Sequence, residues 1–252
     1  MNEKINQLKL DTLPELIRES VRLFSGQLIT ALGENLRSIT VVGSSLTEDF
    51  KPGGSDINTV VVLERQALKS LKSMASMARS MSRKKISPPL LMTLSYIERS
   101  LDVFGVEFLD FQLTHRTVLG DDPLANLTFE KKDVRLQCER ELKAMLIRLR
   151  QGYIAAAANR KLVRDILIST AKGLSPLLRA MLWLKDAERP AGTERTFKKA
   201  ADIFSIKLDS LITADQWRHE KRRLDESQTD KTFESVYSSI EQLAETVDKL
   251  EA

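Results

Sequence analysis

The 252-residue sequence is poor in the residues that build disulfides, clustered metal sites and membrane spans. Cys138 is its one cysteine, which excludes an internal disulfide and a zinc site made of several cysteines. The two histidines, His115 and His219, lie far apart, so a histidine-based metal cluster is not expected. No uncharged apolar run approaches the roughly 18–20 residues of a membrane span, and the first residues lack a signal-peptide stretch. These absences predict a cytoplasmic protein with no membrane partner.

Charge is almost balanced, because 39 basic residues and 35 acidic ones give a net charge of +4. The stretch 65–85 nevertheless holds seven basic residues and no acid: Arg65, Lys69, Lys72, Arg79, Arg83, Lys84 and Lys85. A solvated helix face explains such a run, and attraction for a polyanion such as a nucleoside triphosphate or RNA is the alternative. No aromatic residue lies within the run to stack on bases, so we do not favour a nucleic-acid partner.

The hydrophobic pattern changes near residues 120–130. Before this point the sequence predicts a helix over 13–32 and a set of strands, at 37–42, 56–63, 90–94 and 103–111. Beyond it every apolar stretch has helical spacing, as in Cys138, Leu142, Met145 and Leu149. We therefore expect an α+β fold, with a small mixed β-sheet domain and flanking helices over 1–125, then an all-α helical bundle over 126–252. No β-strand is expected after about residue 125.

The segment from Val41 to Asn58 contains a motif whose residues could bind a ligand and a metal ion. A strand that ends in Gly43-Ser44 lets a ligand approach the backbone closely, and amides of the following turn can hold phosphate oxygens. After an interval of eleven residues come Asp56 and Asn58, whose spacing of two places both side chains on one face of a strand. A carboxylate beside a phosphate cradle is what magnesium-dependent phosphoryl or nucleotidyl transfer requires. A plain turn between two strands, capped by Ser55 and Asp56, is the alternative.

This arrangement resembles the nucleotidyltransferase superfamily, typified by the polymerase-beta-like and kanamycin-nucleotidyltransferase enzymes. Gly43-Ser44 and Ser55-Asp56-Ile57-Asn58 match its signature of a strand, Gly-Ser, an interval, and Asp-hydrophobic-Asp/Glu. The resemblance implies a nucleotidyltransferase domain followed by a helical domain. It implies nucleotide binding by Gly43, Ser44 and Ser55, and a Mg²⁺ site at Asp56 and Asn58.

The family places a third carboxylate on a neighbouring strand. Glu107, in the predicted strand 103–111, is the match, and Asp110 is the second choice. The resemblance then implies that Asp56 and Glu107 are catalytic and that Glu107 completes the metal site. We expect these two carboxylates to approach each other across adjacent strands.

The implied activity is transfer of a nucleoside monophosphate from a nucleoside triphosphate to a hydroxyl acceptor, a small molecule or a protein, with release of pyrophosphate. Asn58 departs from the family pattern, because active members carry a second carboxylate there. An amide oxygen can bind magnesium but brings no negative charge. The alternative is therefore a catalytically impaired regulator of the same fold that binds a nucleotide or a protein partner.

Overall fold

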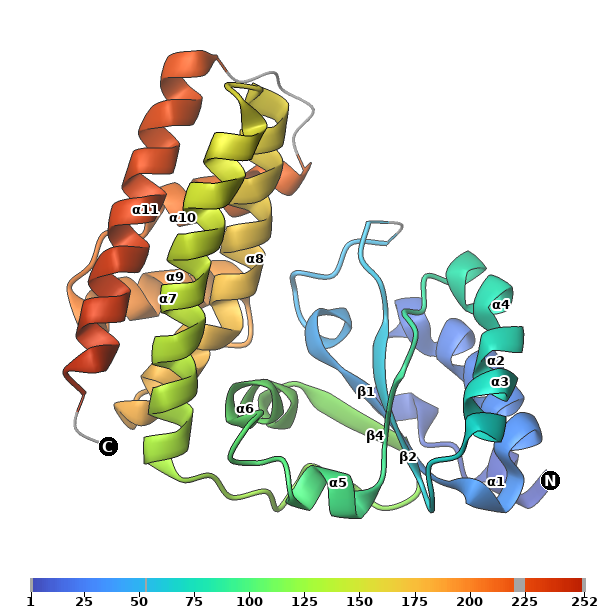
Figure 1. The fold of residues 1–252 in the computed structure, drawn as a ribbon. Coiled ribbons are helices and arrows are strands. Elements are labelled where there is room, and N and C mark those ends of the chain that lie inside the picture. The colour runs from blue at the N-terminus through green and yellow to red at the C-terminus, as the bar shows by residue number, and fades with distance from the viewer. Residues whose placement is uncertain (1, 53, 220–224, 251–252) are drawn as a thin grey trace. The chain divides into compact units, whose positions relative to one another are not determined.

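In the computed structural model, residues 2–52, 54–219 and 225–250 are described (Figure 1). The chain divides into two compact units. Unit 1 comprises Met1–Leu101 and Phe108–Thr128, and unit 2 comprises Asp102–Glu107 and Phe129–Ala252. Among the described helices, none has the length and apolar character needed to cross a membrane.

Unit 1 is built on a four-stranded mixed sheet in the order β3-β2-β1-β4. Its strands are β1 (Leu36–Val42), β2 (Asn58–Leu63), β3 (Leu90–Met92) and β4 (His115–Leu119). β1 pairs antiparallel with β2 and β4, and β2 pairs parallel with β3. β1 and β2 are therefore the two inner strands, and β1 ends at Val42, directly before Gly43.

The helices of unit 1 cover one face of this sheet. Figure 1 shows three of them together there, α2 (Glu15–Leu32), α3 (Leu68–Ser76) and α4 (Ala78–Arg83). The shared core is apolar and fully buried; it includes Ile17, Val21, Phe24 and Leu28 of α2, Ile39 and Val41 of β1, and Met74 and Met81. Alternate β1 residues point to this core, and Thr40 on the opposite face shares a 2.9 Å hydrogen bond with Thr117. Unit 1 also contains two short helices, α1 (Asn2–Asn6) and α5 (Leu94–Glu98).

The strand predicted at 103–111 is wrong, because these residues form helix α6 (Gly105–Leu113). Val106, Phe108 and Leu109 are all buried, and the alternation of Val106, Glu107 and Phe108 imitates a strand locally. Gln137 stabilises the helix start, since its Oε1 accepts a hydrogen bond from the Val106 N–H at 2.9 Å. The fourth strand is instead β4, which the sequence did not predict.

The described residues of unit 2 form helices and their connections and contain no strand, which confirms the prediction of an all-α second half. Its helices are α7 (Lys131–Ala156), α8 (Arg160–Leu184), α9 (Thr193–Phe204), α10 (Asp209–Gln216) and α11 (Glu226–Asp248). α7, α8 and α11 pack against one another in the bundle. Cys138 lies in its core, and burial raises the pKa of this thiol to about 12. The thiol is therefore neutral at physiological pH and acts as an apolar core group.

Candidate functional site

Gly43 and Ser44 form a tight turn at the end of β1. Gly43 has a φ of +78°, a conformation that residues with a Cβ rarely adopt. Its N–H donates to the Thr114 carbonyl at 2.9 Å, so this amide is already used within the sheet. Ser44 is exposed, whereas Ser45 is buried and its hydroxyl has no hydrogen-bond partner among the described residues. The turn thus presents Ser44, rather than the Gly43 amide, to a ligand.

Asp56 and Asn58 share an exposed face, as their spacing predicts. Burial alternates along Ser55 to Thr59, with Asp56 and Asn58 exposed and the residues between and beside them buried. Asn58 pairs with Val42 across the two strands, and a Cβ added to Gly43 would lie 4.0 Å from Asn58 Nδ2. The structure therefore brings the Gly43 turn and the Asp56–Asn58 segment together at one end of the sheet.

Ser55, predicted to bind nucleotide, is held within its own loop. It is 8% exposed, and its Oγ accepts a hydrogen bond from the Lys51 N–H at 3.2 Å. Its N–H in turn donates to the Lys51 carbonyl at 2.9 Å. These bonds close the turn before Asp56, so the contribution of Ser55 in this structure is to fix the direction of the Asp56 backbone.

Glu107 lies on helix α6 and belongs to unit 2, so its predicted position on a sheet strand is wrong. Its exposed carboxylate accepts a hydrogen bond from Gln137 Nε2 at 2.6 Å. Asp110, the second choice, lies on the same helix. Asp56 and Glu107 belong to different units, and their joint role in a metal site stays a prediction.

A histidine that the sequence reasoning left aside lies at the same end of the sheet. Val42 pairs with His115 on one side and with Asn58 on the other, so the two flank it on one face. His115 Nε2 lies 2.9 Å from Asp122 Oδ2, and its Nδ1 lies 3.0 Å from the Gln112 carbonyl oxygen. Both partners are acceptors, so both contacts are hydrogen bonds only when the ring is protonated.

The Asp122 carboxylate collects several donors. Burial raises the pKa of this carboxyl, but hydrogen bonds from the Leu124 N–H, His115 and Thr117 outweigh burial and hold the pKa below its ordinary value of 3.8. The ionised Asp122 carboxylate therefore links the segment after β4 to His115 at the start of that strand. Both ring nitrogens of His115 face partners within unit 1, which gives the His115–Asp122 pair a structural role.

Comparison with solved structures supports this architecture. No protein-family model matches the chain, and no curated protein matches its sequence. Among solved structures, it is similar to the spectinomycin adenyltransferase AAD(9) from Enterococcus faecialis, solved with ATP and spectinomycin. The TM-score is 0.58 at 11% sequence identity, over 88% of this chain and 98% of that chain. The chain has the nucleotidyltransferase fold. This confirms the predicted α+β class and, at the level of the fold, the resemblance drawn from the motif.

The fold implies a magnesium site, and the described residues fit a small one. Mg²⁺ is commonly bound by one or two protein carboxylates together with substrate phosphates and water. Asp56 and the amide oxygen of Asn58, both exposed on one face, suit one such ion arriving with a nucleotide. A cluster built from three carboxylates does not fit, because strands β1 to β4 contain no Asp or Glu. Within the described ranges, no group of three His, Cys, Asp or Glu side chains could hold a metal ion.

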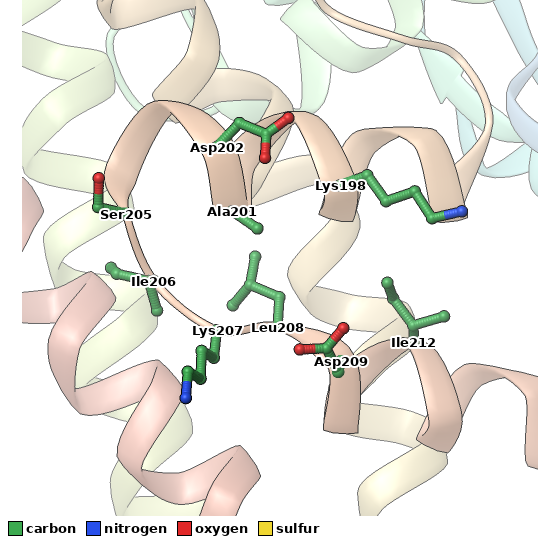
Figure 2. A pocket seen from close by; sticks show the side chains of 9 residues that line it. All are labelled: Lys198, Ala201, Asp202, Ser205, Ile206, Lys207, Leu208, Asp209 and Ile212. Atoms are coloured by element: carbon green, nitrogen blue, oxygen red, sulfur yellow. The ribbon is translucent and has the colours of Figure 1, made fainter.

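Unit 2 contains a separate pocket of about 350 Å³ between α9 and α10 (Figure 2). Lys198 and Asp202 line it from α9, and Lys207 and Asp209 line it from the connection and the start of α10. Lys198 is already paired with Glu194 at 2.6 Å. The mixed charges of this lining show no preference for an acidic or a basic ligand.

Proposed function

We propose that unit 1 binds a magnesium–nucleoside triphosphate complex at the Gly43–Ser44 turn and transfers its nucleoside monophosphate to a hydroxyl acceptor, releasing pyrophosphate. The observation that carries this proposal is the pairing of Val42 with Asn58, which brings the turn beside the exposed Asp56–Asn58 face. The nucleotidyltransferase fold, shared with an adenyltransferase solved with ATP, supports the same assignment.

Each residue has a distinct task in this proposal. Asp56 supplies the one carboxylate of the strand segment and, with the amide oxygen of Asn58, would hold Mg²⁺ against the phosphates. When bound, this ion neutralises charge on the phosphate oxygens and favours attack at phosphorus. Ser44 offers a hydroxyl to the phosphate chain, and Ser55 holds the backbone that positions Asp56.

A second function, nucleotide binding without efficient transfer, is favoured by one specific observation. No strand of the described sheet carries a carboxylate, and Asn58 is neutral, so the protein supplies little negative charge for metal ions. Charge neutralisation contributes much of the rate in phosphoryl-transfer sites, so a site with one carboxylate can bind a nucleotide and turn it over poorly. Such a protein would act as a nucleotide-dependent regulator.

Two measurements on the same preparation separate these functions. Calorimetric titration with ATP, CTP, GTP and UTP in the presence of Mg²⁺ measures binding. Pyrophosphate release is then followed with a panel of hydroxyl acceptors that includes spectinomycin, the ligand of the similar structure. Acceptor-dependent release that Asp56→Ala abolishes supports transfer. Binding without release under every acceptor supports the regulator, and the absence of any binding contradicts both.

A further inference from the structure

The segment Lys85–Ser87 runs alongside the motif residues Asp56 to Asn58. The Ile57 N–H donates to the Lys85 carbonyl at 2.7 Å, and the Ser87 N–H donates to the Ile57 carbonyl at 3.0 Å. Ile57 and Ile86 thereby form a parallel bridge, and both side chains are buried in the core of unit 1. Their neighbours Asp56, Asn58 and Lys85 are exposed. The end of the basic run 65–85 is therefore fixed beside the predicted metal ligands.

Lys85 occupies a backbone position that favours glycine. Helix α4 ends with hydrogen bonds from the Ile86 N–H to the Met81 carbonyl, at 3.0 Å, and from the Lys85 N–H to the Ser82 carbonyl, at 3.1 Å. This is the Schellman pattern, in which the residue after the helix adopts left-handed geometry and is usually glycine. Lys85 has the corresponding φ of +56° despite its side chain. Four other non-glycine residues have a positive φ, among them Ala157 and Ser205 at the ends of α7 and α9, so what distinguishes Lys85 is its place beside the motif.

The charge of Lys85 is available for a ligand. Its side chain is exposed and forms no ion pair with any residue in the described ranges. Of the two motif residues beside it, Asp56 is a carboxylate and Asn58 is neutral. A triphosphate is strongly negative, and an exposed ammonium group attracts it as a point charge.

We infer that Lys85 binds the phosphate chain of the nucleotide and supplies part of the positive charge that a second metal ion provides in a site with more carboxylates. The inference rests on the proposed nucleotide site and adds a residue and a property to it. Nucleotide binding should depend only partly on Mg²⁺, because the Lys85 ammonium remains when the metal is removed.

The test uses ATP as the probe, titrated into the full chain with Mg²⁺ or with EDTA. Lys85→Gln removes the charge, Lys85→Arg keeps it, and Lys72→Gln is the matched control, since Lys72 is an exposed lysine of the same run on α3. We expect Lys85→Gln to weaken ATP binding about tenfold, because contacts to charged groups have that order of effect. Lys85→Arg and Lys72→Gln should bind ATP as tightly as the wild type does. The wild type itself should keep a measurable affinity for ATP in EDTA.

Lys85→Gly separates a binding role from a structural one. Glycine suits the left-handed position, so this variant should have a higher melting temperature and nevertheless a weaker affinity for ATP. Equal ATP affinity in Lys85→Gln and Lys72→Gln, or loss of all wild-type binding in EDTA, would overturn the inference and leave the proposed function standing. No ATP binding by the wild type even with Mg²⁺ would instead contradict the proposed function.

Discussion

Charged residues serve different purposes in the two units. In unit 2, Glu139 lies between Arg135 and Lys143 at 3.0 and 2.5 Å, and Lys131 contacts Asp186 at 2.7 Å. At the sheet end of unit 1, Asp56 and Lys85 are exposed and form no ion pair with described residues. These helical charges are paired with one another, whereas Asp56 and Lys85 have no charged partner among the described residues. Unit 1 is therefore where we expect chemistry, and unit 2 is where we expect charge to contribute to stability.

The two units also differ in what surrounds a glycine that lacks room for a side chain. In unit 1, a Cβ added to Gly120 would lie 2.1 Å from the Arg37 carbonyl oxygen, and Gly120 has a φ of +76°. In unit 2, a Cβ added to Gly152 would meet the end of the flexible Ile166 side chain at 2.9 Å. Backbone cannot move aside as a side-chain tip can, so the sheet tolerates less change than the bundle.

The largest expected effect therefore comes from Gly120→Ala. Left-handed strain and the clash with backbone should together lower the free energy of unfolding by about 3 kcal/mol. Gly152→Ala is the matched control in a helix, where alanine is favoured over glycine, and it should change stability by less than about 1 kcal/mol. Denaturant unfolding followed by circular dichroism measures both. Equal losses in the two variants would contradict the contrast between sheet and bundle.

Asn58→Asp sharpens the contrast in charge. A second carboxylate beside Asp56 should lower the Mg²⁺ concentration needed for half-maximal nucleotide binding about tenfold, because Mg²⁺ prefers carboxylate oxygens. Pyrophosphate release should rise in parallel if missing charge limits transfer. A magnesium titration at fixed ATP measures the first effect. Weaker binding of Mg²⁺ by the variant would show that the neutral amide is required, for example as a donor to Asp56.

Asp122→Asn tests a charge of unit 1 that already has partners. The lowered pKa of Asp122 means that its ionised form stabilises the fold above its ordinary pKa, and that this contribution is lost as pH falls through the folded-state value. The variant should be less stable than the wild type at pH 7, and the difference should shrink as the pH falls below 3.8, the ordinary pKa of this carboxyl. Melting temperatures across this range measure the effect. A constant difference down to pH 3 would disprove the assignment.

The smallest effect is expected from Lys131→Gln in unit 2. Lys131 Nζ lies 2.7 Å from Asp186 Oδ2 and 3.4 Å from the Leu184 carbonyl oxygen at the end of α8. The side chains of Lys131 and Asp186 are 39% and 78% exposed, so the loss should be about 0.5 kcal/mol. Nucleotide affinity should not change. Thermal unfolding and an ATP titration on the same sample check both statements. A change in ATP affinity would contradict the expectation that charges of unit 2 serve stability alone.

Much of the fold could be predicted from the sequence because helical spacing is a local property. The stripe of Cys138, Leu142, Met145 and Leu149 predicts α7, and these residues are buried as expected. Strand β4 could not be found this way. Its sequence, His115 to Leu119, begins with polar residues, and it is a strand because it pairs with β1, more than seventy positions away.

The candidate site shows the same division. The shared face of Asp56 and Asn58 follows from a spacing of two, which is local. The place of Lys85 depends on the bridge between Ile57 and Ile86, a pairing that sequence spacing does not reveal. Glu107 was assigned to a strand because its apolar neighbours alternate, although helical packing and the contact with Gln137 decide its conformation. The positions of His115 and Lys85 at the sheet end, which sequence reasoning missed, depend on pairing between distant residues.

The central claim, that the sheet end of unit 1 binds magnesium and nucleotide through Asp56, is tested most directly by calorimetric titration of Mg²⁺–ATP into wild type and Asp56→Ala. Asp11→Ala serves as the matched control, because Asp11 is an exposed acid of the same unit that lies outside the motif. We expect wild type and Asp11→Ala to bind alike and Asp56→Ala to lose affinity roughly 10–100-fold, with its melting temperature unchanged. Unchanged affinity in Asp56→Ala would show that the motif is structural in this chain and would contradict the account.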